Sequence, residues 1–112
     1  MTKRTLKVLK SAIVKWERIL SGKGADKGFA NCALCRLFIT HKCRYCPVQL
    51  ATGKRNCEGA PYERWVKHQR RVHEGEANLV PIRLTGCKTC RRLAEEELAF
   101  LKSLLPKGAA KI

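Results

Sequence analysis

Cysteine spacing constrains this chain more than any other feature of its sequence. Three pairs have the spacing C-x-x-C, namely Cys32/Cys35, Cys43/Cys46 and Cys87/Cys90. A seventh cysteine, Cys57, makes the count odd, so a full set of disulfides would leave one thiol over. Two cysteines three residues apart on a tight turn can direct both sulfur atoms at one metal ion, and two such turns complete a tetrahedron. The spacing therefore predicts a metal site rather than buried free cysteines that act as small hydrophobic residues.

The composition gives a reason for such a site. The chain has 112 residues, the size of one ordinary domain, and Phe, Trp and Tyr together account for only seven of them. Few bulky side chains make a small apolar core, whereas closing a zinc site can contribute on the order of 10 kcal/mol to folding. The sequence contains neither a secretory signal nor a stretch apolar enough to span a membrane. We therefore expect one zinc-stabilised domain, residues 1–112, in the reducing cytoplasm.

The sequence leaves open which cysteines share an ion. One model places Cys32, Cys35, Cys43 and Cys46 around a single zinc ion. A second model joins the Cys32/Cys35 pair to the Cys87/Cys90 pair and builds another site from Cys43, Cys46, Cys57 and His68. All seven cysteines are thus predicted ligands, and His68 is a minority candidate. We expect one zinc ion or two, with an iron–sulfur cluster, which also takes four thiolates, as the second choice.

Hydrophobic periodicity predicts three helices. A basic amphipathic helix is expected over residues 1–20, with Leu6, Leu9, Ile13, Trp16 and Leu20 on one face. A second is expected over residues 61–73, opened by Pro61, and a third over residues 87–105. The cysteine-rich residues 28–60 between them are expected to be loops, and the first helix is expected to pack on the third. The predicted fold is an α-rich small domain of three helices around a loop-rich C-x-x-C metal site, with little strand.

Charge is the second informative feature. Lys and Arg total 24 and Asp and Glu total 9, so the formal net charge is +15. A net charge of this size predicts attraction to polyanions, among which nucleic acid is the first choice. The predicted phosphate contacts are Lys7, Lys10, Lys15, Arg18, Arg44, Arg64, Lys67, Arg70 and Arg71. No residues form an evident base-reading pattern, so low sequence specificity is expected. Trp16 and Trp65 fall on apolar helix faces and are expected in the core rather than stacked on bases.

The sequence gives little support for an enzymatic function. A metal nuclease gathers carboxylates and histidines on a catalytic ion, yet the chain contains a single Asp, Asp26. Glu95, Glu96 and Glu97 follow two arginines on the third helix and are expected on a solvated face with weak ion pairs. The pair Cys87/Cys90 at a helix start suits dithiol redox chemistry, but no βαβ scaffold accompanies it. The chain is predicted not to be an enzyme, and an iron–sulfur or dithiol redox role is a distant alternative.

The cysteine segment also carries a family resemblance. It reads Cys32-Ala-Leu-Cys35, Cys43-x-x-Cys46-Pro-Val, Cys57-Glu-Gly-x-Pro-Tyr62, and the third helix ends in Glu97-Leu-Ala-Phe-Leu-Lys-Ser-Leu-Leu-Pro106. Over residues 16–66 and that ending, the chain resembles small uncharacterised cysteine-rich proteins of bacteriophage and prophage genomes. Their pattern has five cysteines, matched here from Cys32 to Cys57, and Cys87/Cys90 is additional. The resemblance implies a phage-type setting and a bound metal.

Two function classes follow from these features. The first is a zinc-binding, strongly basic small protein that binds nucleic acid mainly through phosphate contacts. The second is a phage-type interaction module whose basic residues meet an acidic surface of a host or viral protein. Binding to an anionic membrane surface is not expected, because the apolar face of the first helix is accounted for by packing on the third helix.

Overall fold

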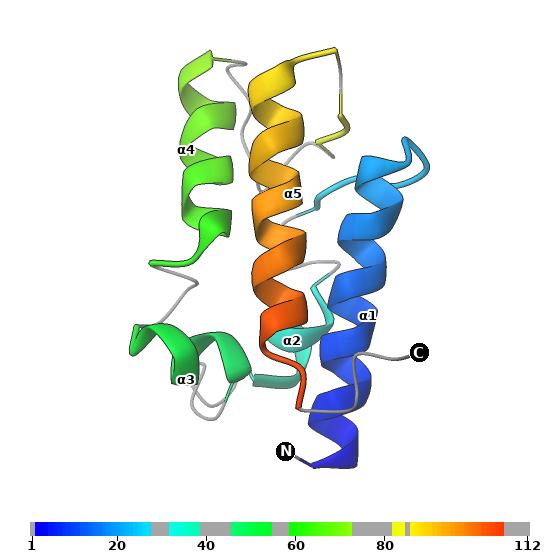
Figure 1. Cartoon of the computed structure of the whole chain (residues 1–112), viewed down its shortest axis with the longest axis vertical. Coiled ribbons are helices and arrows are strands. Elements are labelled where there is room, and N and C mark those ends of the chain that lie inside the picture. Colours follow the sequence, from blue (N-terminus) through cyan, green and yellow to red (C-terminus); the bar gives the residue numbers. More distant parts are fainter. Residues whose placement is uncertain are drawn as a thin grey trace.

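The computed structural model describes residues 2–27, 32–38, 46–54, 59–72, 82–84 and 86–106, and helices form most of these ranges. In this part of the chain the helices are α1 (Lys3–Leu20), α2 (Ala33–Phe38), α3 (Pro47–Thr52), α4 (Pro61–Val72) and α5 (Lys88–Ser103). The three long helices lie side by side with α5 in the middle, and α2 and α3 lie toward the end where α1 begins (Figure 1). The prediction of an α-rich fold is confirmed.

α1 begins where its first turn can be capped. The Thr2 hydroxyl oxygen accepts a hydrogen bond from the Thr5 backbone N–H at 3.0 Å, which satisfies one of the amides left unpaired at a helix start. Its apolar face buries Leu9, Ile13 and Trp16, and the helix packs against α5 and α2. The predicted packing of the first helix on the third is therefore confirmed.

α4 and α5 form an antiparallel pair (Figure 1). Pro61 occupies the first turn of α4, where its missing N–H costs nothing, and the Glu63 carboxylate accepts the Gly59 N–H at 2.7 Å. α5 follows Cys87, whose extended backbone forms the N-cap without a side-chain hydrogen bond to the helix. Both helices fall within one or two residues of the predicted ranges 61–73 and 87–105.

The cysteine-rich residues 28–60 were predicted to form loops, but two short helices lie in this region. α2 starts directly after Cys32, and α3 starts at Pro47 after Cys46. α3 ends at Gly53, whose φ of 73° is a left-handed conformation that glycine adopts without steric cost. Each helix has six residues, fewer than two turns, so neither could produce a visible hydrophobic period.

The core is centred on two tryptophans. Trp16 of α1 and Trp65 of α4 are both buried, and their rings meet edge to face with centroids 5.2 Å apart. Their expected place in the core is confirmed. An isolated antiparallel bridge between Asp26 and Ile82, with both N–H···O distances 2.8 Å, joins the loop after α1 to the segment before α5.

In the described ranges, no helix combines enough length with enough hydropathy to cross a lipid bilayer.

Candidate metal centre

Three metal-ligating side chains meet between α4 and the start of α5. They are His68 on the third turn of α4, Cys87 at the N-cap of α5, and Cys90 in the first turn of α5. Their donor atoms all lie within 4.8 Å of one another. No other group of three or more such residues gathers in the parts of the chain that the structure describes. The cluster depends on the antiparallel pairing of the two helices, which brings His68 to cysteines about twenty positions later.

One distance in this cluster matches tetrahedral coordination. His68 Nε2 and Cys87 Sγ are 3.5 Å apart. For Zn–N of about 2.0–2.1 Å and Zn–S of about 2.3 Å, the two donors of a tetrahedron stand about 3.6 Å apart. Two cysteines and a histidine are also a donor set that zinc commonly takes. These three residues can therefore hold a metal ion.

A neighbouring side chain supports the sulfur of Cys90. Gln69 Nε2 donates a hydrogen bond to Cys90 Sγ at 3.3 Å, and both side chains are buried. Burial raises the pKa of the Cys90 thiol, and the nearby Cys87 sulfur raises it further, while the hydrogen bond from Gln69 acts in the opposite direction. A bound cation would lower the pKa of this thiol instead, since it stabilises the thiolate directly. The buried amide is thus placed to orient a metal ligand.

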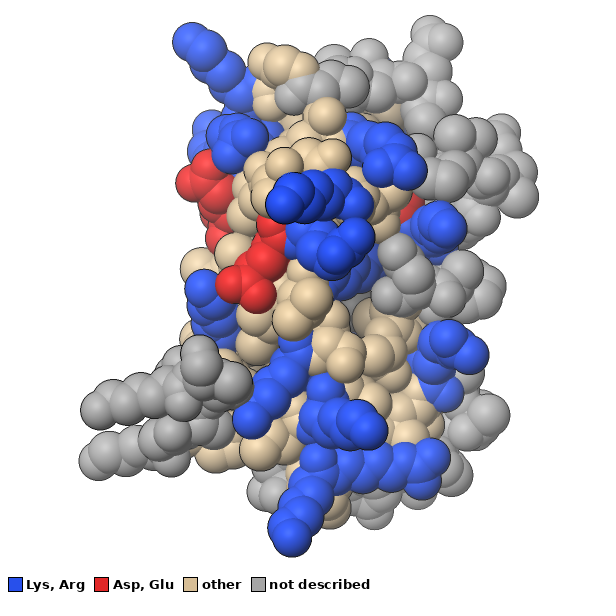
Figure 2. All heavy atoms as spheres, turned by 90° about the vertical axis from the view of Figure 1, so that its right-hand side faces the viewer, with Lys and Arg blue, Asp and Glu red and all other residues tan. Residues whose placement is uncertain are grey.

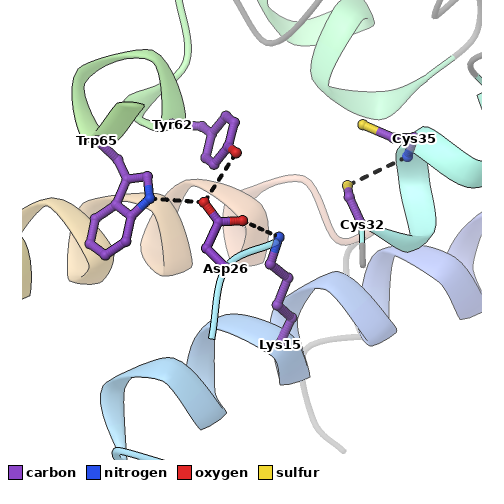
Figure 3. Close-up of polar contacts among 6 residues, drawn as sticks. All are labelled: Lys15, Asp26, Cys32, Cys35, Tyr62 and Trp65. Atoms are coloured by element: carbon purple, nitrogen blue, oxygen red, sulfur yellow. Dashed lines mark hydrogen bonds and ion pairs between the residues drawn. The ribbon is translucent and has the colours of Figure 1, made fainter. Parts of the chain in front are cut away.

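The other described C-x-x-C pair, Cys32/Cys35, lies at the start of α2 and outside this group of donor atoms. The Cys35 backbone N–H donates to Cys32 Sγ at 3.4 Å (Figure 3). Hydrogen bonding with the Cys35 side chain lowers the pKa of Cys32 to about 6 against the opposing effect of burial, and the Lys15 charge contributes to the lowering. The Cys32 sulfur is close enough to Glu97 for its charge to raise the pKa of that carboxyl. Glu97 lies two helical turns, about 10 Å, beyond Cys90.

These positions bear on the two ligand models. Among the described residues the structure gathers Cys87 and Cys90 with His68, and the pairing of Cys32/Cys35 with Cys87/Cys90 in the second model stays a prediction. The minority candidate His68 joins two cysteines to which neither model had assigned it, because both models worked from spacing along the chain. Cys46 is buried at the N-cap of α3. Cys43 and Cys57 lie outside the described residues. The first model, which needs Cys43, and the second site of the second model, which needs both, therefore stay predictions.

A second polar cluster is fully enclosed by α1, α4 and the loop between α1 and α2 (Figure 3). The Asp26 side chain is 0% exposed, and its Oδ1 lies 2.8 Å from Lys15 Nζ. The Tyr62 hydroxyl and the Trp65 indole N–H donate to Oδ2 at 3.1 Å and 2.9 Å. The carboxylate is therefore neutralised and hydrogen-bonded inside the protein, as a buried charge requires.

This cluster corrects one predicted phosphate contact. Lys15 was expected to bind nucleic acid, but its side chain is only 9% exposed and forms the ion pair with Asp26. The position lies at the edge of the apolar face of α1, and the buried carboxylate draws the ammonium group inward. The Tyr62 hydroxyl also bonds to Asp26, and its ring meets that of Trp16 edge to face with centroids 5.9 Å apart.

Glu97 is a second correction. Its side chain was expected on a solvated face with Glu95 and Glu96, yet the residue is buried at 5% exposure, and its Oε1 has no hydrogen-bond partner among the residues that the structure describes. Desolvation raises the pKa of Glu97 to about 8, and the Cys32 charge adds to the rise while the Lys15 charge opposes it. At neutral pH the carboxyl is therefore mostly protonated. Its spacing from the buried Ala94 and Leu101, three and four residues away, was the signal in the sequence.

The remaining predicted phosphate contacts lie on two surfaces. On α1, Lys7 and Arg18 are exposed and Lys10 is half-buried. On the side of the molecule on which α1 lies, many Lys and Arg side chains and few acids are visible among the other residues (Figure 2). On α4, Arg64, Lys67, Arg70 and Arg71 are all exposed. Arg44 lies outside the described residues.

Comparisons with protein-family models, with curated proteins and with solved structures gave no match for this chain.

Proposed function

We propose that this chain is a zinc-binding, basic protein of the phage type that binds nucleic acid through its phosphates. The observation that carries the proposal is a stripe of cations along α1, here called the α1 stripe. It consists of Lys3, Lys7, Lys10 and Arg18, with Arg4 at its edge. The spacing of four, three and eight residues keeps these side chains on one face of the helix, opposite Leu9, Ile13 and Trp16.

The α1 stripe has the length and charge to follow a phosphate backbone. From Lys3 to Arg18 the helix rises about 22 Å, along which a duplex presents on the order of a dozen phosphates. Glu17 is the one acid of α1, and its carboxylate lies 4.0 Å from Lys102 Nζ rather than between the cations. A surface of this kind attracts any nucleic acid sequence, because it offers no set of side chains arranged to read bases.

The metal part of the proposal rests on the donor set. A histidine and two cysteines suit zinc, and a four-thiolate iron–sulfur cluster would need two more sulfurs at the same place. Zinc there would hold α4 to the start of α5, which makes its role structural. It would supply no catalytic step in this proposal.

Fluorescence anisotropy with a mixed-sequence DNA duplex and a single-stranded RNA, at several salt concentrations, tests the nucleic acid part. We expect micromolar-range binding with a slope of log K against log salt of roughly −4 or steeper on duplex DNA, since each phosphate contact contributes about −0.9. The variant Lys7→Glu should flatten this slope. The control Lys54→Glu changes the net charge equally at an exposed residue outside the stripe and should leave the slope nearly unchanged.

The opposite result would decide for the other class of partner. If the protein shows no binding at low salt, or if both variants act alike, the α1 stripe does not contact phosphates. An acidic surface of a host or viral protein would then be the better match for its charge.

A further inference from the structure

A second group of cations lies around the metal centre, on the other side of α5 from α1. We propose that the seam between α4 and α5 is a second phosphate-binding surface, which the metal ion at His68, Cys87 and Cys90 holds together. This inference rests on the proposed function and adds to it a separate site with its own dependence on metal. We call it the seam surface, and its cations are Arg64, Lys67, Arg71, Lys88 and Arg92.

One ion pair fixes how the two helices face each other there. Arg64 Nη2 on α4 lies 3.2 Å from Glu96 Oε1 on α5. Because the helices are antiparallel, one turn forward on α4 corresponds to one turn back on α5 (Figure 1). His68, which contacts Cys87 at 3.5 Å, therefore lies between the levels of Cys87 and Arg92. Arg71, one turn further along α4, and Lys88, next to Cys87, lie within about two helical turns of this centre.

The seam surface is not neutralised by its own acids. Arg64 and Lys67 are paired with Glu96 and Glu63 at 3.2 Å and 3.0 Å. Arg71, Lys88 and Arg92 are exposed and form no ion pair with the described residues. Arg91 points to the opposite side, where its guanidinium donates to the Leu20 carbonyl of α1 at 3.3 Å. Within the described ranges, three cations at the metal end of the seam therefore have no acid paired with them.

The metal ion explains how these cations can stand together. Like charges on facing helices repel one another, and the start of α5 has no side-chain cap to hold it in place. Coordination by two thiolates and a neutral imidazole leaves zinc with no net charge, so the ion adds no repulsion of its own. Its binding free energy, of the order of 10 kcal/mol in small zinc domains, is far larger than repulsion between exposed charges.

A nucleic acid backbone is the partner that this geometry favours. From the level of Arg64 to that of Arg71 the seam extends about 10 Å, which is the axial rise of three nucleotides on one strand. Arginine presents a planar fork that binds phosphate oxygens in pairs, and two of the three available cations are arginines. The seam surface would thus add about two or three phosphate contacts to those of the α1 stripe.

The test uses the zinc-loaded full chain and the same anisotropy measurement with a mixed-sequence duplex. Arg71→Glu/Arg92→Glu removes two seam contacts and should flatten the salt slope by about 1.8. Lys7→Glu/Lys10→Glu makes an equal change of charge on the α1 stripe and should flatten it by a similar amount. Combining the four substitutions should add the two effects, because the surfaces share no residue.

A second readout reports from the metal itself. With Co²⁺ bound in place of zinc, the visible absorption of the cobalt–thiolate centre should shift when the duplex is added. The shift should persist in Lys7→Glu/Lys10→Glu and disappear in Arg71→Glu/Arg92→Glu. Two results together would overturn the seam surface and leave the α1 stripe intact. The first is a salt slope of Arg71→Glu/Arg92→Glu equal to that of the wild type, and the second is a wild-type cobalt spectrum that does not change when the duplex is added. Loss of all nucleic acid binding by the wild-type chain would instead overturn the proposed function, and the seam surface with it.

Discussion

Two polar clusters hold α4 in place, and they differ in the source of their positive charge. Around Asp26, the chain supplies its own cation, Lys15, together with two neutral donors from α4. Around His68, the chain brings together an imidazole and two sulfurs, which are ligands for a cation that the sequence does not encode. The first cluster is complete as soon as the chain folds, whereas the second would be completed only by a metal ion taken up from solution. We therefore expect the fold to respond to metal at one end of α4 and to mutation of the ion pair at the other.

Of the changes that distinguish the two clusters, removal of the metal should have the largest effect on stability. Zinc-loaded protein treated with a strong chelator should lose a large part of its thermal stability, because metal binding of this kind contributes on the order of 10 kcal/mol. Cys90→Ser should lower the zinc content by one equivalent, measured by elemental analysis of purified protein. Cys32→Ser should leave that equivalent in place. Equal zinc loss in the two variants, or an unchanged melting temperature after chelation, would contradict the centre described here.

Breaking the ion pair of the Asp26 cluster should have the next largest effect on stability. Lys15→Met leaves the Asp26 carboxylate buried without its counter-charge, and such losses cost about 3–5 kcal/mol. Urea unfolding at saturating zinc measures this cost. Lys10→Met, the same substitution at a half-buried position of the same helix, should cost less than about 1 kcal/mol. The double variant Lys15→Met/Asp26→Asn should recover part of the loss, since it removes the unpaired charge. Equal unfolding midpoints for the two single variants would show that the ion pair is not needed.

The smallest effect is expected from Glu97, and it appears as a dependence on pH. The folded protein holds the Glu97 proton up to a pKa of about 8, while the unfolded chain releases it near 4.5. Between these values the folded state binds more protons, so the Glu97 contribution to stability falls as pH rises. Over two pH units within this window the decrease approaches about 2 kcal/mol.

Two variants isolate this contribution. Glu97→Gln cannot ionise, so its unfolding free energy should decline less between pH 5.5 and pH 7.5 than that of the wild type, on the order of 2 kcal/mol less. Glu95→Gln, an exposed residue of the same helix, should follow the wild-type profile. Parallel profiles for all three proteins would mean that the Glu97 carboxyl is already ionised inside the fold.

The sequence predicted the long helices well because each carries its own repeating signal. These signals are local and do not depend on contacts with another helix. They are the apolar period of α1, Pro61 at the start of α4 and Pro106 beyond α5. α2 and α3 have no such signal within six residues. They depend on Pro47 and Gly53 at the ends of α3, and on packing that only the folded chain supplies.

The candidate site was only partly predictable, for a physical reason. The C-x-x-C spacing predicts that Cys87 and Cys90 can bind the same ion, because both ligands lie within one turn. The third ligand, His68, comes from another helix, and nothing along the chain states which face of α4 meets the start of α5. Lys15 posed the same difficulty in reverse. Its charge predicted solvent exposure, and only the position of Asp26 in space shows why it is buried.

The packing of α1 against α5 also has a consequence for synthesis on the ribosome. The two helices lie at opposite ends of the described chain, and α5 begins only at Lys88. At translation rates of about 5–20 residues per second, the apolar face of α1 emerges on the order of ten seconds before its partner does. During that interval Leu9, Ile13 and Trp16 have no α5 to cover them. The nascent chain should therefore depend on chaperones, or on the mutual repulsion of its many cations, to stay unaggregated until α5 arrives.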